Sequence, residues 1–343
     1  MPRIRFSAIW KAQRENSLLP LLLKECRTID SARNELRWLR EAVQDPSHPA
    51  GWSRLRSMCR LRSKGYPLQY ILGNQPFGEL EILCRKGVLI PRPETESYTY
   101  KSAQLVRKFN RTNSARPLRI LDLCTGTGCI SLLLHALLAP HFPSLSITGV
   151  DISPVALSLA QRNLQHNQQL GQLAHRAATD IQFHRADVLG DGSESVPPIR
   201  SLLQSLGLGS DHQPSEHSQC DLLISNPPYI SRAEFRNGTT ARSVRLFEPE
   251  LALVPPAVSE DSRPEDIFYL RILTLANELR AQLVVLECGD LAQAQRVVAL
   301  HAQLTSNEYR FEAEIWPNRE QDLAEYGFHE TDGSRCVIIQ RLL

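Results

Sequence analysis

Beyond residue 116 the chain alternates between short apolar runs and longer helical stretches, and this alternation restricts the possible folds more than any other feature. The runs are rich in Ile, Leu and Val, the residue types that favour buried strands. The predicted strands are residues 118–123, 146–150, 181–184, 221–225 and 283–287, and helical stretches such as 154–167 and 265–280 separate most of them. Because strands that alternate with helices form a parallel sheet covered on both faces, the sequence predicts an α/β fold.

Two later apolar runs, residues 310–315 and 336–341, are predicted to close the sheet as an antiparallel pair, which brings the expected number of strands to seven. Between the third and fourth strands, residues 191–219 carry Ser, Gly, Pro and His with little apolar periodicity. We therefore predict an inserted surface loop there.

The first part of the chain predicts a small helical domain. Apolar residues recur at helical spacing from Leu18 to Val43, and a second helix is predicted over residues 52–62. Residues 77–90 contain two apolar runs on either side of Arg85-Lys86-Gly87, which predicts a β-hairpin that leads into a polar loop at 91–96. The expected divisions are a helical domain (1–64), a linker with the hairpin (65–97) and the sheet domain (98–343).

Charge is distributed unevenly along the chain. Residues 1–62 contain 13 Lys and Arg against 6 Asp and Glu, a net charge of +7, whereas the whole chain has a formal net charge of +2. A basic segment favours an acidic or nucleic-acid-bearing partner, although a solvated helical surface has the same composition. The first fourteen residues hold four basic residues and no acid, a feature of organelle transit peptides. We predict a mitochondrial location, with a cytoplasmic one as the alternative.

The sequence argues against two other classes of protein, namely disulfide- or metal-stapled domains and membrane-spanning proteins. The eight cysteines are scattered without a CxxC pair or a His-Cys cluster, which indicates reduced thiols and offers no spacing for a metal site. The longest apolar runs, such as residues 130–140, are shorter than the roughly 20 residues of a membrane-spanning helix. No membrane partner is therefore predicted.

The first candidate site follows the first predicted strand, where residues 120–129 are ILDLCTGTGC. Glycine permits positive φ and close backbone approach, and the helix that follows offers unpaired N–H groups to a nucleotide-like ligand. A structural turn without a ligand is the alternative. Cys124 stands where the GxGxxG pattern of dinucleotide sites has its first glycine, which argues against a pyrophosphate cofactor.

Carboxylates follow the next two predicted strands. Asp151 comes directly after the second strand, where a carboxylate can accept both hydroxyl groups of a ribose. It could instead cap the following helix, but Ser153 is better placed for that role. After the third strand, Asp187 is placed to accept the exocyclic amine of an adenine, although any acid at a strand end fits that description.

The most specific segment is Asn226-Pro227-Pro228-Tyr229, after the fourth strand. Its two prolines fix φ and remove backbone donors, so the loop is stiff and its carbonyl groups can face a ligand. An amide nitrogen is a poor nucleophile because its lone pair is delocalised. If the Asn226 side-chain oxygen and the Pro227 carbonyl each accept one of its N–H bonds, they direct the lone pair at an electrophile. Tyr229 supplies a flat apolar wall; the alternative is a rigid turn with a packed tyrosine.

These motifs, in this order, resemble the HemK (PrmC) family of protein-glutamine N5-methyltransferases over most of the chain. The supporting stretches are residues 67–73 (PLQYILG), 89–96 (LIPRPETE), 122–128 (DLCTGTG), 221–230, 248–249 with Leu251 and Leu253, 286–289 (LECG) and 332–335 (DGSR). Members of the family use S-adenosylmethionine to methylate the glutamine of the Gly-Gly-Gln loop in class I translation release factors. The resemblance implies a Rossmann-like class I methyltransferase domain with a seven-stranded sheet, joined by the hairpin to an N-terminal helical domain that docks the release factor.

The resemblance also implies roles for individual residues. The methionine part of S-adenosylmethionine would lie against Cys124, Thr125, Gly126, Thr127 and Gly128, the ribose on Asp151, and the adenine beside Asp187 and Val188. The substrate glutamine would be held by Asn226, Pro227, Pro228 and Tyr229, of which Asn226, Pro227 and Tyr229 would be catalytic and Asn226 would also meet the cofactor. Arg92 and Glu94, at the active-site mouth, receive no individual role.

The chain departs from the family in three places. Cys124 replaces a glycine, residues 254–257 are VPPA where the family has a Gly-Gly-Asp-Gly turn, and residues 191–219 are longer than expected. Two alternative functions remain open at this point. An adenine-N6 methyltransferase of DNA or RNA faces the same lone-pair problem and uses a similar loop, but it would need more recognition surface for a flipped base than a short helical domain supplies. A non-catalytic translation-factor adaptor is disfavoured by the intact Asn226 and Asp151.

Overall fold

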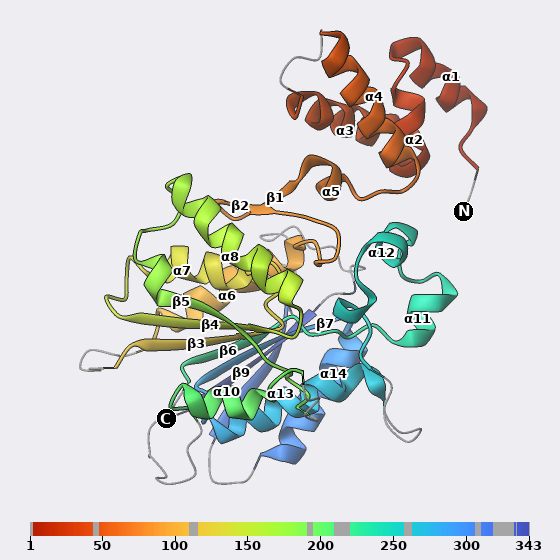
Figure 1. The fold of residues 1–343 in the computed structure, drawn as a ribbon. Coiled ribbons are helices and arrows are strands. Elements are labelled where there is room, and N and C mark those ends of the chain that lie inside the picture. Colours follow the sequence, from red (N-terminus) through yellow and green to blue (C-terminus); the bar gives the residue numbers. More distant parts are fainter. Residues whose placement is uncertain are drawn as a thin grey trace.

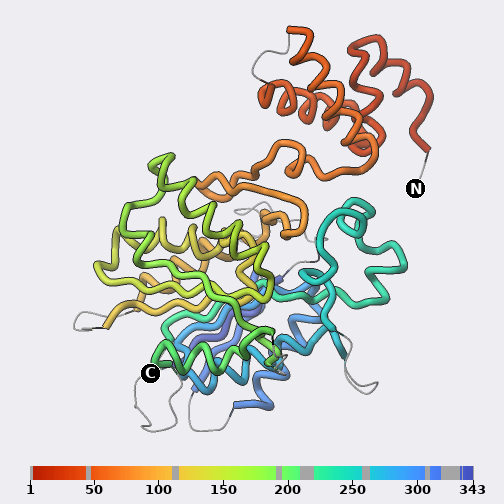
Figure 2. The backbone as a smooth tube through the Cα atoms, viewed as in Figure 1, coloured from red at the N-terminus to blue at the C-terminus, as the bar shows by residue number. Residues whose placement is uncertain are grey.

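In the computed structural model, the described residues are 3–43, 48–109, 116–190, 195–208, 220–256, 263–305, 310–317, 333 and 335–342. A group of N-terminal helices stands apart from a larger sheet domain, and a hairpin connects the two (Figure 1). Figure 2 shows the chain leaving the helices through residues 64–90 before it enters the sheet domain.

The sheet has seven strands in the order β5-β4-β3-β6-β7-β9-β8. They are β3 (Leu118–Leu123), β4 (Leu145–Asp151), β5 (Ile181–Arg185), β6 (Leu222–Ser225), β7 (Leu283–Cys288), β8 (Arg310–Trp316) and β9 (Arg335–Leu342). The first five are mutually parallel, and β9 is antiparallel to both β7 and β8. The predicted strands and the closing antiparallel pair are therefore confirmed. Strand order reverses between β3 and β6, the kind of switch point at which α/β sheets bind ligands outside their carboxyl ends.

Helices cover both faces of this sheet. One face buries apolar side chains of α6 (Pro93–Val106), α7 (Cys129–Leu138) and α8 (Pro154–Gln169). The other buries those of α10 (Ile199–Ser205), α13 (Ile267–Glu278) and α14 (Leu291–Leu304). Figure 1 shows these two layers on opposite sides of the strands. Since both faces are covered, the central strands are largely apolar instead of alternating.

The predicted loop at 191–219 is in part wrong. Residues 191–194 and 209–219 lie outside the described residues, but α10 forms between them. Ile199 and Leu203 are spaced one helical turn apart and are both buried against the sheet, which explains why this short segment is helical within a polar surrounding. The segment also pairs with the stretch after β5, through a bridge between Asp187 and Pro198.

The N-terminal residues are helical, as predicted, with two additions, α1 (Phe6–Glu15) and α5 (Leu68–Leu72). The other helices are α2 (Leu19–Cys26), α3 (Ile29–Glu41) and α4 (Pro49–Ser63). They bury a core of their own that includes Leu22, Leu39 and Leu55. A half-buried ion pair of 2.8 Å between Arg62 Nε and Glu35 Oε2 joins α4 to α3. The unpredicted α1 covers most of the basic first fourteen residues.

The hairpin is present, but its predicted turn is wrong. The strands are β1 (Asn74–Phe77) and β2 (Leu80–Leu83), so the chain turns at Gly78 (φ +58°) instead of at residues 85–87. Helix α8 holds the free edge of β2, because the backbone N–H of Leu83 donates to Asn163 Oδ1 at 2.8 Å.

The polar loop predicted at 91–96 is also wrong in its second half. Pro93 takes the first turn of α6, and Glu94 and Glu96 lie in that turn, where proline and acidic side chains are favourable. Thr95 is consequently a helical residue.

The two parts of the molecule meet at α12 (Arg242–Phe247), which follows α11 (Arg232–Asn237). The rings of Tyr66 and Phe247 pack edge to face with centroids 4.9 Å apart. Arg242 Nη1 lies 4.0 Å from Oε1 of Glu25, a residue of α2. Within the residues described, no helix is long and apolar enough to cross a bilayer.

Candidate active site

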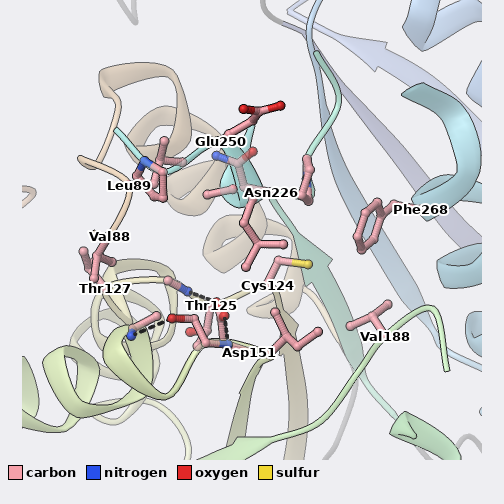
Figure 3. A pocket seen from close by; sticks show the side chains of 18 of the residues that line it. Val88, Leu89, Cys124, Thr125, Thr127, Asp151, Val188, Asn226, Glu250 and Phe268 are labelled. Atoms are coloured by element: carbon pink, nitrogen blue, oxygen red, sulfur yellow. Dashed lines mark hydrogen bonds between the residues drawn. The ribbon is translucent and has the colours of Figure 1, made fainter. Parts of the chain in front are cut away.

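A cavity of about 560 Å³ opens at the carboxyl ends of β3, β4, β5 and β6 (Figure 3). It brings together side chains that each follow a different strand, as parallel topology requires. The sequence-predicted residues that line it are Cys124, Thr125, Gly126, Thr127, Asp151, Asp187, Val188, Asn226 and Pro228. The other lining residues include 87–92, Thr95, Ser153, 249–252, 254–256 and Phe268.

The loop after β3 has the left-handed backbone that its glycines predict. Gly126 and Gly128 have φ of +56° and +79°, and Cys124 has φ of +60°. A Cβ on Gly128 would lie only 3.0 Å from Ala160 and from the Phe183 ring, which explains the glycine. Cys124 also has a positive φ, although it carries a side chain. A left-handed backbone costs such a residue roughly 1–2 kcal/mol. Burial and the nearby Asp151 raise the pKa of Cys124 well above its ordinary value, so its thiol is neutral.

Asp122 supports this loop from beneath and was missed by the sequence reasoning. Its Oδ2 accepts hydrogen bonds of 2.6 Å from the hydroxyls of Thr125 and Ser131. The carboxyl is fully buried, and this burial raises its pKa to about 6. The available signal was a charged residue within an otherwise apolar strand.

Asp151 lies at the end of β4 and aims its carboxylate at the same loop. Oδ2 accepts the backbone N–H of Gly126 at 2.9 Å, and Oδ1 accepts that of Ser153 at 2.8 Å. Burial raises the pKa of Asp151, against the opposing effect of these backbone bonds. Ser153 caps α8, with its hydroxyl accepting from the backbone of Ala156, as predicted. Each carboxylate oxygen has capacity for a further donor from the cavity.

Asp187 and Val188 line the cavity beyond the end of β5. Asp187 Oδ1 accepts the backbone N–H of Leu189 at 2.9 Å, which fixes the turn. The buried Val188 and Phe268 lie at the same end of the cavity (Figure 3). Phe268 comes from α13 and gave no signal in the sequence, since an aromatic residue in an amphipathic helix ordinarily marks the core.

Asn226, Pro227, Pro228 and Tyr229 follow β6 and stand where two cavities adjoin. Asn226 lines both the 560 Å³ cavity and a neighbouring one of about 150 Å³, while Pro227 and Tyr229 line only the smaller. The Asn226 Nδ2 donates to Thr95 Oγ1 at 3.3 Å, and the Tyr229 hydroxyl donates to Glu287 Oε1 at 2.9 Å. Both prolines are buried, so the loop is as rigid as its composition predicts.

Arg92 takes part in an ion pair that orders the wall opposite Asn226. Its Nη2 donates to Glu248 Oε1 at 2.7 Å, and the backbone N–H of Ile90 donates to Oε2 at 3.1 Å. The Glu248 side chain is only 2% exposed. Arg92 lines both cavities, whereas Glu94 lines neither.

Comparisons with known proteins find a family model, relatives by sequence and similar solved structures. Residues 120–189 match the family model described as "Methyltransferase domain". The "Probable MRF1 mitochondrial N(5)-glutamine methyltransferase mtq1" of Schizosaccharomyces pombe is 35% identical over 99% of this chain and 97% of its own length. The "Mitochondrial MRF1 N(5)-glutamine methyltransferase MTQ1" of Saccharomyces cerevisiae is 38% identical over 74% of this chain and 68% of its own length. Among solved structures, the N-terminal domain of human METTL16 aligns with 83% of this chain and 82% of its own, with a TM-score of 0.46 and 16% identity.

Proposed function

This chain belongs to the release factor glutamine methyltransferase family, and on that premise we propose how its residues carry out the reaction. The activity is transfer of a methyl group from S-adenosylmethionine to the side-chain nitrogen of a glutamine in a translation release factor. Family membership decides against the adenine-N6 methyltransferase and the non-catalytic adaptor, which the Asn226 loop alone leaves open. By the same resemblance, the glutamine is that of the Gly-Gly-Gln loop in a class I factor.

The larger cavity fits S-adenosylmethionine, which supplies the electrophilic methyl group when bound. Asp151 presents a buried carboxylate with acceptor capacity for ribose hydroxyls. Val188 and Phe268 offer apolar surface for the adenine, and Asp187 an acceptor for its amine. The glycine loop, from Cys124 to Gly128, lets the backbone approach the methionine part closely.

The smaller cavity, beside Asn226 and Pro227, suits the substrate glutamine. Asn226 Oδ1 and the Pro227 carbonyl accept the two N–H bonds of the glutamine amide and so direct its lone pair into the larger cavity. Tyr229 confines the amide plane. This support strengthens as positive charge develops on nitrogen, and stronger binding in the transition state is what accelerates a reaction. No general base is needed, since a methylated, protonated amide nitrogen gives its proton to water readily.

The single observation that carries this proposal is the place of Asn226 at the junction of the two cavities. Asn226→Ala should lower kcat by about 10²-fold, as when one preorganised polar group is removed from a reacting centre. The Kd of the Asn226→Ala enzyme for S-adenosylmethionine should change much less than its kcat. Single-turnover methyl transfer to a Gly-Gly-Gln release factor measures the rate. Asn237→Ala, the same change on α11, is the matched control, and a near wild-type rate for Asn226→Ala would refute the mechanism.

The helical domain, residues 1–64, serves in this proposal to dock the release factor. Its net positive charge and separate core support that role. We also assign the chain to the mitochondrion, since both yeast relatives bear that location in their names and the first fourteen residues are basic.

A further inference from the structure

A buried carboxylate, Glu287, lies behind the loop that holds the substrate amide. It sits on β7 with an exposed fraction of 1%. Its Oε2 accepts the hydroxyl of Thr95 at 2.7 Å, and its Oε1 accepts the hydroxyl of Tyr229 at 2.9 Å. Burial raises the pKa of Glu287, while the hydroxyls of Tyr98, Thr95 and Tyr229 oppose the rise by stabilising the ionised form. The reaction described above makes no direct use of this group.

The chemistry of a carboxylate sets the direction of every hydrogen bond in this network. The Thr95 hydroxyl donates to Glu287 Oε2, so its one proton is committed to that carboxylate. The Thr95 oxygen can then only accept from its other neighbour, which is Asn226 at 3.3 Å. That neighbour must be the NH₂ end of the Asn226 amide. The carbonyl end, Oδ1, is left to face away from Thr95.

We propose that Glu287 and Thr95 are positioning residues that fix which end of the Asn226 amide faces the substrate. This inference rests on the proposed function. With the amide turned by 180°, Asn226 would present its NH₂ group to the NH₂ group of the glutamine, and neither could accept. Because Glu287 also receives the Tyr229 hydroxyl, one carboxylate holds both the amide acceptor and the ring beside it. Such a network is worth more than its separate bonds because each bond removes an alternative for the next.

The test compares two replacements of Thr95. Thr95→Val keeps the shape and removes the hydroxyl, while Thr95→Ser keeps the hydroxyl. Thr95→Val should lower kcat by roughly tenfold, which corresponds to one hydrogen bond, with Kd for S-adenosylmethionine within about twofold, and Thr95→Ser should restore most of the rate. The matched control is Thr99→Val. Thr99 lies one turn along α6 and is fully buried, and its hydroxyl donates to the backbone carbonyl of Thr95 at 2.6 Å, away from the Asn226 amide, so kcat should not change.

A double-mutant cycle separates positioning from general damage to the structure. In the Asn226→Ala background, Thr95→Val should cause no further loss of kcat, because Thr95 acts only through Asn226. Glu287→Gln, which disturbs the network without changing its shape, serves if Thr95→Val does not fold. Its loss of kcat should be smaller in the Asn226→Ala background than in the wild type, and the loss that remains there is the part carried by Tyr229. Additive losses, or a Thr95→Val enzyme with wild-type kcat, would overturn the proposal. A wild-type enzyme that fails to methylate a release factor would instead overturn the proposed function.

Discussion

Replacing Asp151 by Ala tests the cofactor assignment most directly. In the structure each carboxylate oxygen already holds one backbone N–H, from Gly126 and from Ser153. Two ribose hydroxyls would therefore donate their hydrogen bonds to a carboxylate that is already held in place. A hydrogen bond to a charged group contributes about 1.5–3 kcal/mol. We expect Asp151→Ala to weaken S-adenosylmethionine binding by about 2–3 kcal/mol, or roughly 30- to 150-fold in Kd.

The same residue also shapes the glycine loop, so the assay must distinguish loss of a ribose contact from loss of loop order. Isothermal titration calorimetry with S-adenosylhomocysteine and with its 2′-deoxy analogue makes that distinction. The wild type should bind the deoxy analogue more weakly, whereas Asp151→Ala should bind both ligands alike. Thr28→Ala, which removes the side-chain cap of α3 and lies outside both cavities, is the control for stability and should leave Kd nearly unchanged. An unchanged Kd for Asp151→Ala, or an equal preference for the hydroxyl in both proteins, would refute the assignment.

Two further predictions concern stability and docking. The folded-state pKa of Asp122, about 6, exceeds its ordinary value of 3.8, so its contribution to stability is present below pH 4 and is lost as pH rises through 6. At about 1.4 kcal/mol per pKa unit, this shift amounts to about 3 kcal/mol of unfolding free energy. Between pH 4 and pH 7, the unfolding free energy of Asp122→Asn, measured by urea titration, should rise by that amount relative to the wild type. A difference that stays constant with pH would exclude the raised pKa. For docking, charge reversal at the exposed Arg54 and Arg56 should raise KM for the release factor in a salt-dependent way without changing Kd for S-adenosylmethionine. An unchanged KM would show that this face does not dock the factor.

The sheet was predictable because its signal is local. Buried parallel strands are continuous apolar runs, and each run in 118–287 coincides with an observed strand to within one residue at either end. The misplaced hairpin turn and the missed α10 have the opposite character. Gly78 and Gly87 both have positive φ, and the choice between them depends on how β2 meets Asn163 and Asn167 of α8. These two hydrogen bonds span 80 and 86 residues of sequence and have no local signature.

Part of the site was predictable for a related reason. Asp151, Asp187 and Asn226 each follow a strand, and parallel topology brings strand ends to one edge. Thr95 and Glu287 could not be found in this way. They are separated by 192 residues, and each looks ordinary in its own segment. Their importance arises only when α6 crosses the end of β7 and places a hydroxyl between a carboxylate and Asn226.

Three buried carboxylates to which the sequence assigned no role share a physical one, which is to hold the cavity walls from behind. Asp122 supports the glycine loop, Glu248 the segment that carries Arg92, and Glu287 the Asn226 loop. Each is a buried carboxylate whose desolvation is unfavourable unless hydroxyl or N–H donors compensate it. Most of those donors lie on segments that line the cavities, so satisfying the carboxylate also fixes the cavity wall. The proposed methyl transfer to a neutral amide uses no general base. Its acceleration comes from acceptors that are held rigidly in place. The desolvation cost of burying three carboxylates is consistent with this need for rigid cavity walls.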